Sequence, residues 1–154
     1  MQVPDATAEQ QQLHLLVGTW AGEEHIQPSP WDPSGATARA TVRNEPAMGG
    51  LAVVQEYDQE RDGSVAFRGL GVFRWDAAAG EVHLFWLDTL SPHPRDFRGT
   101  FEGDVLTLTS REARGQARAT WDFSAADRYT YRLDASPDGE TWMPYIEATY
   151  ARQG

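Results

Sequence analysis

Val65–Asp88 reads VAFRGLGVFRWDAAAGEVHLFWLD, and this segment guides the interpretation of the whole chain. Two runs rich in β-branched and aromatic residues flank Asp76–Gly80, a loop that begins with a turn-forming Asp and ends with Gly. The pattern predicts a β-hairpin. Because side chains alternate between two faces along a strand, only one face of the first arm suits a core. That face carries Phe67, Gly69, Gly71, Phe73 and Trp75.

The second arm of the hairpin is apolar on both faces. Val82, Leu84, Trp86 and Asp88 share one face, and His83, Phe85 and Leu87 share the other. We therefore expect this strand to be covered on both sides. Gly69 and Gly71 lack side chains where a core strand normally packs them, which indicates a sharp bend or a place kept open. The hairpin thus predicts a curved antiparallel barrel with an interior pocket.

The segments before the hairpin suggest a short helix followed by strands. Thr7 and Gln10 have the spacing of a capping box, so we expect a helix over about Ala8–Leu16 that docks across one barrel mouth. In the strand that follows, Glu24 shares the inward face with Trp20, while His25 faces outward. The proline-rich segment Gln27–Gly35 is predicted to be a loop. Ala36–Arg43 then alternates small residues with Thr and Arg, which leaves volume inside.

Turn signals recur about every 8 to 15 residues along the rest of the chain, and no long helix interrupts them. This is the pattern of a sandwich or a barrel. Faces that combine small and aromatic residues favour the barrel, because a sandwich core prefers interdigitating aliphatic side chains. We predict an all-β fold, an antiparallel meander of about ten strands with room for one small ligand.

Length and charge restrict the class of protein. The 154 residues suit a single domain (1–154), in which we expect residues 1–6 to be flexible. A net charge of −10 makes nucleic acid and anionic membranes unlikely partners. The absence of cysteine excludes disulfides and thiol chemistry. The chain has no signal-peptide pattern and no membrane-length apolar run, so we expect a soluble cytoplasmic protein.

Several short signatures appear in order along the chain. They are Leu16-Val17-Gly18-Thr19-Trp20, Met48-Gly49-Gly50-Leu51 with Val54-Gln55-Glu56-Tyr57, Gly69-Leu70-Gly71-Val72-Phe73, Phe85-Trp86-Leu87-Asp88, Phe101-Glu102-Gly103-Asp104-Val105-Leu106, and Asp138-Gly139-Glu140-Thr141-Trp142 with Glu147-Ala148-Thr149-Tyr150. Together they resemble a bacterial family of unknown function that is grouped with the calycins, the lipocalin-like barrels. The resemblance covers nearly the whole chain from Leu13.

The resemblance implies a lipocalin-like meander barrel with Trp20 packed at one end, and it implies no established activity. The distantly similar nitrobindins hold haem through a histidine near the end of the chain. Here the last histidine is His93, and Glu147 and Tyr150 occupy the closing strand. This departure argues against haem, and we expect no cofactor.

Candidate ligand-binding residues combine carboxylates and amides with aromatic walls. Strand parity places Glu24 and Glu147 in the pocket, where a carboxylate is costly unless it is paired. A register error of one residue would put either outside, and Asp88 could simply begin a loop. The four histidines lack metal-ligand spacing, so we expect no metal site. The predicted ligand-binding set is Glu24, Gln55, Trp86, Asp88, Trp121, Tyr131 and Glu147.

Three functional hypotheses follow. The leading one is binding of a small, largely apolar molecule inside the barrel, with aromatic walls and a few hydrogen-bonding points. The second is an enzyme, a cyclase or isomerase of a natural-product-like substrate, that uses the same pocket without a recognisable motif. The third is a structural or interaction module, with an exposed sheet edge or the Gln27–Gly35 loop forming a homodimer contact.

Overall fold

The computed structural model describes residues 1–29 and 32–154; Pro30 and Trp31, part of the predicted proline-rich loop, lie outside the described residues. A short helix α1 (Ala8–Gln12) continues into a 3₁₀ turn η1 (Leu13–Leu16). A second 3₁₀ turn, η2 (Met48–Gly50), separates β2 from β3. The strands are β1 (Gly18–Ile26), β2 (Ala36–Ala47), β3 (Ala52–Arg61), β4 (Ser64–Asp76), β5 (Glu81–Asp88), β6 (Arg95–Glu102), β7 (Val105–Glu112), β8 (Gly115–Asp122), β9 (Arg128–Ser136) and β10 (Met143–Arg152).

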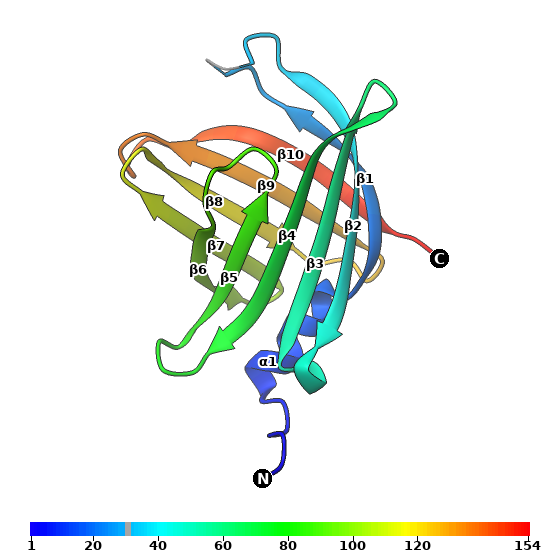
Figure 1. Cartoon of the computed structure of the whole chain (residues 1–154), viewed down its shortest axis with the longest axis vertical. Coiled ribbons are helices and arrows are strands. Elements are labelled where there is room, and N and C mark those ends of the chain that lie inside the picture. The colour runs from blue at the N-terminus through cyan, green and yellow to red at the C-terminus, as the bar shows by residue number, and fades with distance from the viewer. Residues whose placement is uncertain (30–31) are drawn as a thin grey trace.

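The strands form a closed antiparallel barrel (Figure 1). Each strand pairs with its neighbour in sequence, and β10 pairs with β1 to close the ring. The predicted meander barrel is confirmed, and the sandwich alternative is wrong. Closure also pairs both sides of every described strand, so the exposed sheet edge of the homodimer hypothesis is absent from the described part of the chain.

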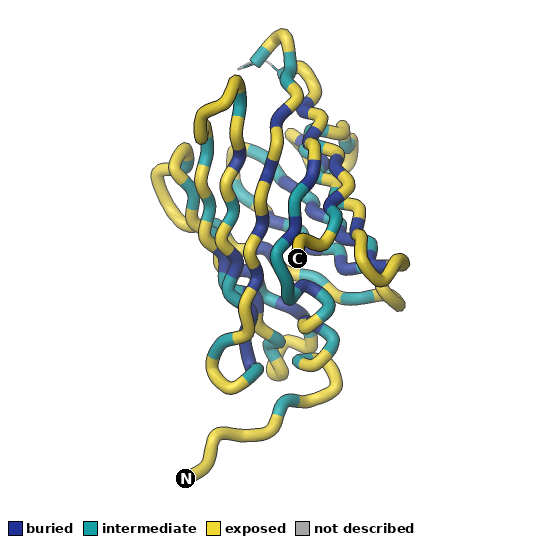
Figure 2. The backbone as a smooth tube through the Cα atoms, turned by 90° about the vertical axis from the view of Figure 1, so that its right-hand side faces the viewer, coloured by how far each residue is buried: buried dark blue, intermediate teal, exposed yellow. Residues whose placement is uncertain are grey.

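The predicted alternation is visible along β2. Ala38, Ala40 and Val42 are buried, whereas Arg39 and Thr41 between them are exposed. Figure 2 shows the same alternation of buried and exposed segments along neighbouring strands. One face of each strand therefore lines the barrel interior, and the other meets water.

The N-terminal segment closes one end of the barrel, as predicted. The capping box of Thr7 and Gln10 starts α1, and the helix tightens to 3₁₀ geometry from Leu13 onward. Leu13 and Leu16 are almost completely buried. The Trp20 indole donates to the backbone oxygen of Leu16 at 3.0 Å, so the helical segment is tied to β1. Among the described residues, no helix is long and apolar enough to cross a lipid bilayer.

The central hairpin is confirmed as β4 and β5, but its second arm is not covered on both faces. Phe85 and Leu87 remain 39% and 38% exposed. They pair across the outer surface with Val72 and Leu70 of β4. A barrel is a single layer, so its outer face has no second sheet to cover it, and cross-strand apolar pairs supply only partial burial there.

The two glycines of β4 also have a different role from the one expected. The indole of Trp86 on β5 packs directly against Gly69 and Gly71, and a Cβ at Gly69 would overlap that ring. The space left by the glycines is therefore filled by Trp86 and is not kept open for another molecule.

Candidate functional site

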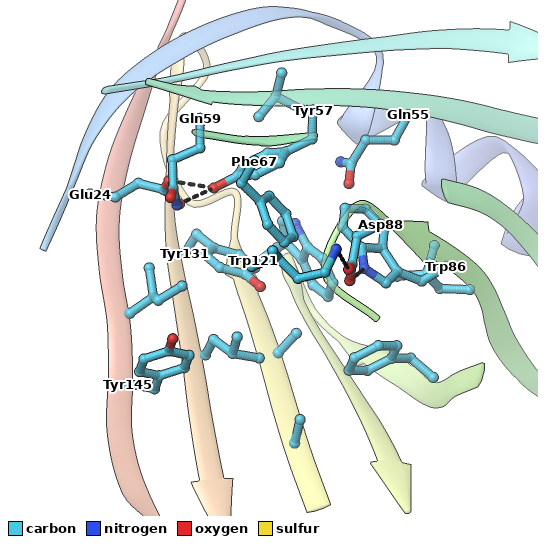
Figure 3. Close-up of a pocket in the computed structure, with 18 of the residues that line it drawn as sticks. Glu24, Gln55, Tyr57, Gln59, Phe67, Trp86, Asp88, Trp121, Tyr131 and Tyr145 are labelled. Atoms are coloured by element: carbon cyan, nitrogen blue, oxygen red, sulfur yellow. Dashed lines mark hydrogen bonds between the residues drawn. The ribbon is translucent and has the colours of Figure 1, made fainter. Parts of the chain in front are cut away.

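The barrel encloses a cavity of about 480 Å³ between the closed end and the opposite mouth. Its wall is mainly aromatic and aliphatic, with a small number of carboxylate, amide and guanidinium groups. Six of the seven predicted site residues line it: Glu24, Gln55, Trp86, Asp88, Trp121 and Tyr131 (Figure 3). These residues come from β1, β3, β5, β8 and β9, so the fold brings together side chains that are distant in sequence.

Glu147 does not belong to the cavity wall, and its predicted place in the pocket is wrong. In the pairing of β10 with β1, Glu147 lies opposite His25, which faces outward, and both side chains are exposed. Ala148 and Tyr150 take the inward positions. A bulge between Pro144 and Ile146 breaks the regular alternation at the start of β10, so parity counted along the segment is unreliable there.

Glu24 is the centre of a buried hydrogen-bond cluster. Its side chain is 1% exposed, and its two carboxylate oxygens accept from three donors. Tyr57 donates to Oε1, Gln59 Nε2 donates to the same oxygen at 3.0 Å, and the Tyr150 hydroxyl donates to Oε2 at 2.8 Å. The three donors therefore satisfy both oxygens of this buried carboxyl group within the protein.

The tyrosines around this cluster are held neutral. Burial raises the pKa of Tyr57 and Tyr150 well above the usual range, and the negative charge of Glu24 raises both further. Burial also raises the pKa of Tyr129 and Tyr131. These phenols therefore act as hydrogen-bond donors and apolar walls at neutral pH.

Asp88 was predicted either to line the pocket or to begin a loop, and in the structure it does both. Its Oδ2 accepts from the Trp86 indole at 2.8 Å and from the Ser91 hydroxyl at 3.2 Å. Its Oδ1 accepts from the backbone of Leu90 and Ser91. Asp88 thus positions Trp86 in the wall and shapes the loop at the mouth.

Several polar groups of the wall form no side-chain hydrogen bond within the described residues, among them the Gln55 amide and the Tyr131 hydroxyl. The Gln55 side chain is 6% exposed, yet its amide forms no side-chain hydrogen bond there. The Tyr131 hydroxyl also has none, although its ring contacts Trp121 at a centroid distance of 5.3 Å. Both residues line the cavity, so both groups are available to a bound molecule.

Two arginines reach the cavity near its mouth, and each lies close to an acid. Arg61 pairs with Asp32 at 3.1 Å and donates to Gln59, which links it to the Glu24 cluster. Arg95 lies 3.3 Å from Glu112. No group of three or more His, Cys, Asp or Glu side chains in the described part of the chain is arranged to hold a metal ion.

The sequence analysis missed three members of the cluster, namely Tyr57, Gln59 and Tyr150. Tyr57 and Gln59 have the same parity on β3 as Gln55, so extending the inward face by four residues would have found them. Tyr150 gave no such signal, because its inward position depends on the register of β10 against β1.

Comparison with known proteins supports the fold. Residues 5–152 match a family described as "Protein of unknown function (DUF1579)". No curated protein matches the chain. The crystal structure of Rv2717c from M. tuberculosis is similar, with a TM-score of 0.74, 20% identity, and coverage of 97% of this chain and 100% of that one. The S-type phycobiliprotein lyase CPES from Guillardia theta has a TM-score of 0.61, 10% identity, and coverage of 97% and 99% respectively.

Proposed function

This chain belongs to the DUF1579 family of proteins of unknown function, and we propose that its barrel binds a small, largely apolar molecule. The observation that carries the proposal is the cavity of about 480 Å³. Its size lies within the range of small-molecule sites, which are concave, mainly apolar and supplied with a few placed polar groups. The two structural neighbours share only the fold, so no activity is transferred from them.

The cavity wall suggests how such a molecule would be held. Trp86 and Trp121 offer broad apolar surfaces, and the unpaired groups of Gln55 and Tyr131 offer hydrogen bonds. A ligand that satisfies both groups gains two hydrogen bonds that also fix its orientation in the cavity. We do not extend the proposal to haem, since the described wall contains no histidine and His93 is exposed.

Binding is better supported than catalysis. A general acid or base must be able to give or take a proton at the reacting atom. The oxygens of Glu24 already accept from three donors, and the surrounding phenols are kept neutral by their raised pKa. The cluster therefore suits recognition and support of the wall.

Native mass spectrometry of the protein purified from its own host tests the proposal directly. We expect a co-purified mass that is lost on denaturation. A matched pair of variants locates it: Ala119→Trp places an indole in the cavity, whereas Thr120→Trp places the same group on the outer face of β8. The proposal predicts loss of the bound mass in the first variant only. Retention of that mass by a folded Ala119→Trp protein would overturn it.

A further inference from the structure

We propose that the molecule held in the barrel is a cation whose positive charge pairs with Glu24. This inference rests on the proposed function and deepens it by naming the ligand class: an aromatic or aliphatic ammonium, or a protonated nitrogen heterocycle. The observations that support it are the unbalanced charges of the cavity wall and the aromatic rings around them.

The charged side chains of the wall do not neutralise one another. Asp32 pairs with Arg61, and Arg95 forms an ion pair with Glu112 just outside the wall, at 3.3 Å and without a hydrogen bond from Nε. Glu24 and Asp88 then remain, and neither forms an ion pair within residues 1–29 and 32–154. The cavity therefore carries two carboxylates without a cationic partner.

Of these two carboxylates, Glu24 has the greater need of a counter-charge, because it is the more deeply buried. It is buried to 1% exposure, and a buried charge without a counter-charge is costly even after relaxation. Its three donors are neutral, so they lower that cost without cancelling the charge. Arg61 reaches Glu24 only through Gln59, because its own charge is engaged by Asp32. A bound cation would supply the missing partner.

The rings near Glu24 suit a cation as well. In Figure 3 the side chains of Tyr57, Phe67 and Trp121 lie between Glu24 on one side and Asp88 on the other. Tyr57 is in edge contact with both Phe67 and Trp86, at centroid distances of 5.7 and 6.2 Å. A cation over the face of such a ring is attracted by the ring quadrupole, most strongly when the cation is desolvated. The chain's net charge of −10 also attracts cations to the mouth.

A pair of isosteric probes tests this inference. (2-Naphthylmethyl)trimethylammonium and 2-neopentylnaphthalene have the same shape and differ in the replacement of N⁺ by carbon. Their dissociation constants are measured by equilibrium dialysis against the full chain. We expect the cation to bind about tenfold tighter or more, a difference of about 1.4 kcal/mol.

Variants assign that preference to Glu24. Glu24→Gln removes the charge and keeps the shape, and Glu147→Gln makes the same change on the outer face as a control. We expect the cation-to-neutral ratio to fall towards one in Glu24→Gln and to stay unchanged in Glu147→Gln. If Glu24→Gln does not fold, the ratio measured for the unmodified chain decides alone.

The outcomes separate the two proposals. Equal binding of both probes, or tighter binding of the neutral one, overturns the cation inference and leaves the small-molecule proposal standing. An unchanged ratio in folded Glu24→Gln also overturns it. Failure of both probes to bind overturns the inference together with the proposed function.

Discussion

The two ends of the barrel are built from the same ten strands but are filled in opposite ways. At the closed end, Leu13 and Leu16 enter from the helical segment and pack with Trp20. Towards the other end, small residues such as Ala117 and Ala119 on β8 face the interior, and no segment enters to replace the missing volume in the described structure. The comparison shows that alternation makes the barrel, whereas side-chain size and one extra segment decide which part stays hollow.

This difference separates stability from binding. Close-packed side chains at the closed end contribute dispersion and hydrophobic free energy. The hollow half instead contains a buried carboxylate and four tyrosines with raised pKa. These side chains supply the cavity with charged and hydrogen-bonding groups.

Alkaline pH is expected to act through the hollow half. Tyr57, Tyr129, Tyr131 and Tyr150 stay protonated in the folded state, because burial and the charge of Glu24 raise their pKa. The unfolded chain loses these protons near pH 10, so stability is full below that pH and falls above it. Each tyrosine contributes up to about 1.4 kcal/mol per pH unit, and the four together about 6 kcal/mol at pH 11.

Urea unfolding between pH 8 and pH 11 measures this loss. The basic residues are all arginine, so no lysine titration overlaps with it. Tyr150→Phe removes one of the four contributions and is expected to reduce the slope by about a quarter. A free energy of unfolding that stays level up to pH 11 would contradict the assignment.

Removing a large side chain from each end compares them directly. Trp20 is 1% exposed, and Trp20→Ala is expected to cost about 3–5 kcal/mol because the closed end cannot fill the void. Trp86 borders a space that is already empty, and Trp86→Ala is expected to cost about 1–2 kcal/mol while weakening ligand binding. Urea unfolding at pH 7 checks both values, and equal losses would remove the distinction between the two ends.

A polar contact at the closed end has a smaller effect. Asn44 is buried, and its Nδ2 donates to the backbone oxygen of Leu16 at 2.8 Å. Its Oδ1 is buried without a partner in the described residues, so Asn44→Ala removes one favourable bond and one unsatisfied acceptor together. We expect a net loss of about 1 kcal/mol by chemical denaturation. If Asn44→Ala lowered the free energy of unfolding as much as Trp20→Ala, packing of the whole closed end would depend on this contact.

The outer surface provides the reference for both ends. Arg43 and Glu56 form an ion pair at 3.0 Å between β2 and β3, with both side chains more than half exposed. We expect Arg43→Ala to change the free energy of unfolding by less than about 1 kcal/mol and to leave probe binding intact. A larger change in the free energy of unfolding would show that this surface ion pair is coupled to the packing of the interior.

Several features followed from local pattern alone. The hairpin of β4 and β5, the capping box at Thr7 and the inward face of Glu24 were predicted and are present. These succeed because turn chemistry and the two-residue period act between near neighbours in the chain. The same reasoning placed six of seven predicted residues in the cavity wall.

The errors have a common origin in longer-range geometry. Glu147 was misplaced because a bulge shifts the start of β10, and Phe85 was expected to be covered although a single-layer barrel exposes its outer face. The role of Gly69 depends on Trp86, which comes from another strand. No local period carries such information.

The amino-acid sequence by itself determined the alternating strands, their turns and the small inward residues that leave volume in the barrel. Only the tertiary structure decided that Tyr57, Gln59 and Tyr150 meet at Glu24 and that the helical segment closes one end. The reason is physical: alternation is set by the geometry of one strand, whereas the meeting of side chains from β1, β3 and β10 requires the register and closure of the whole sheet.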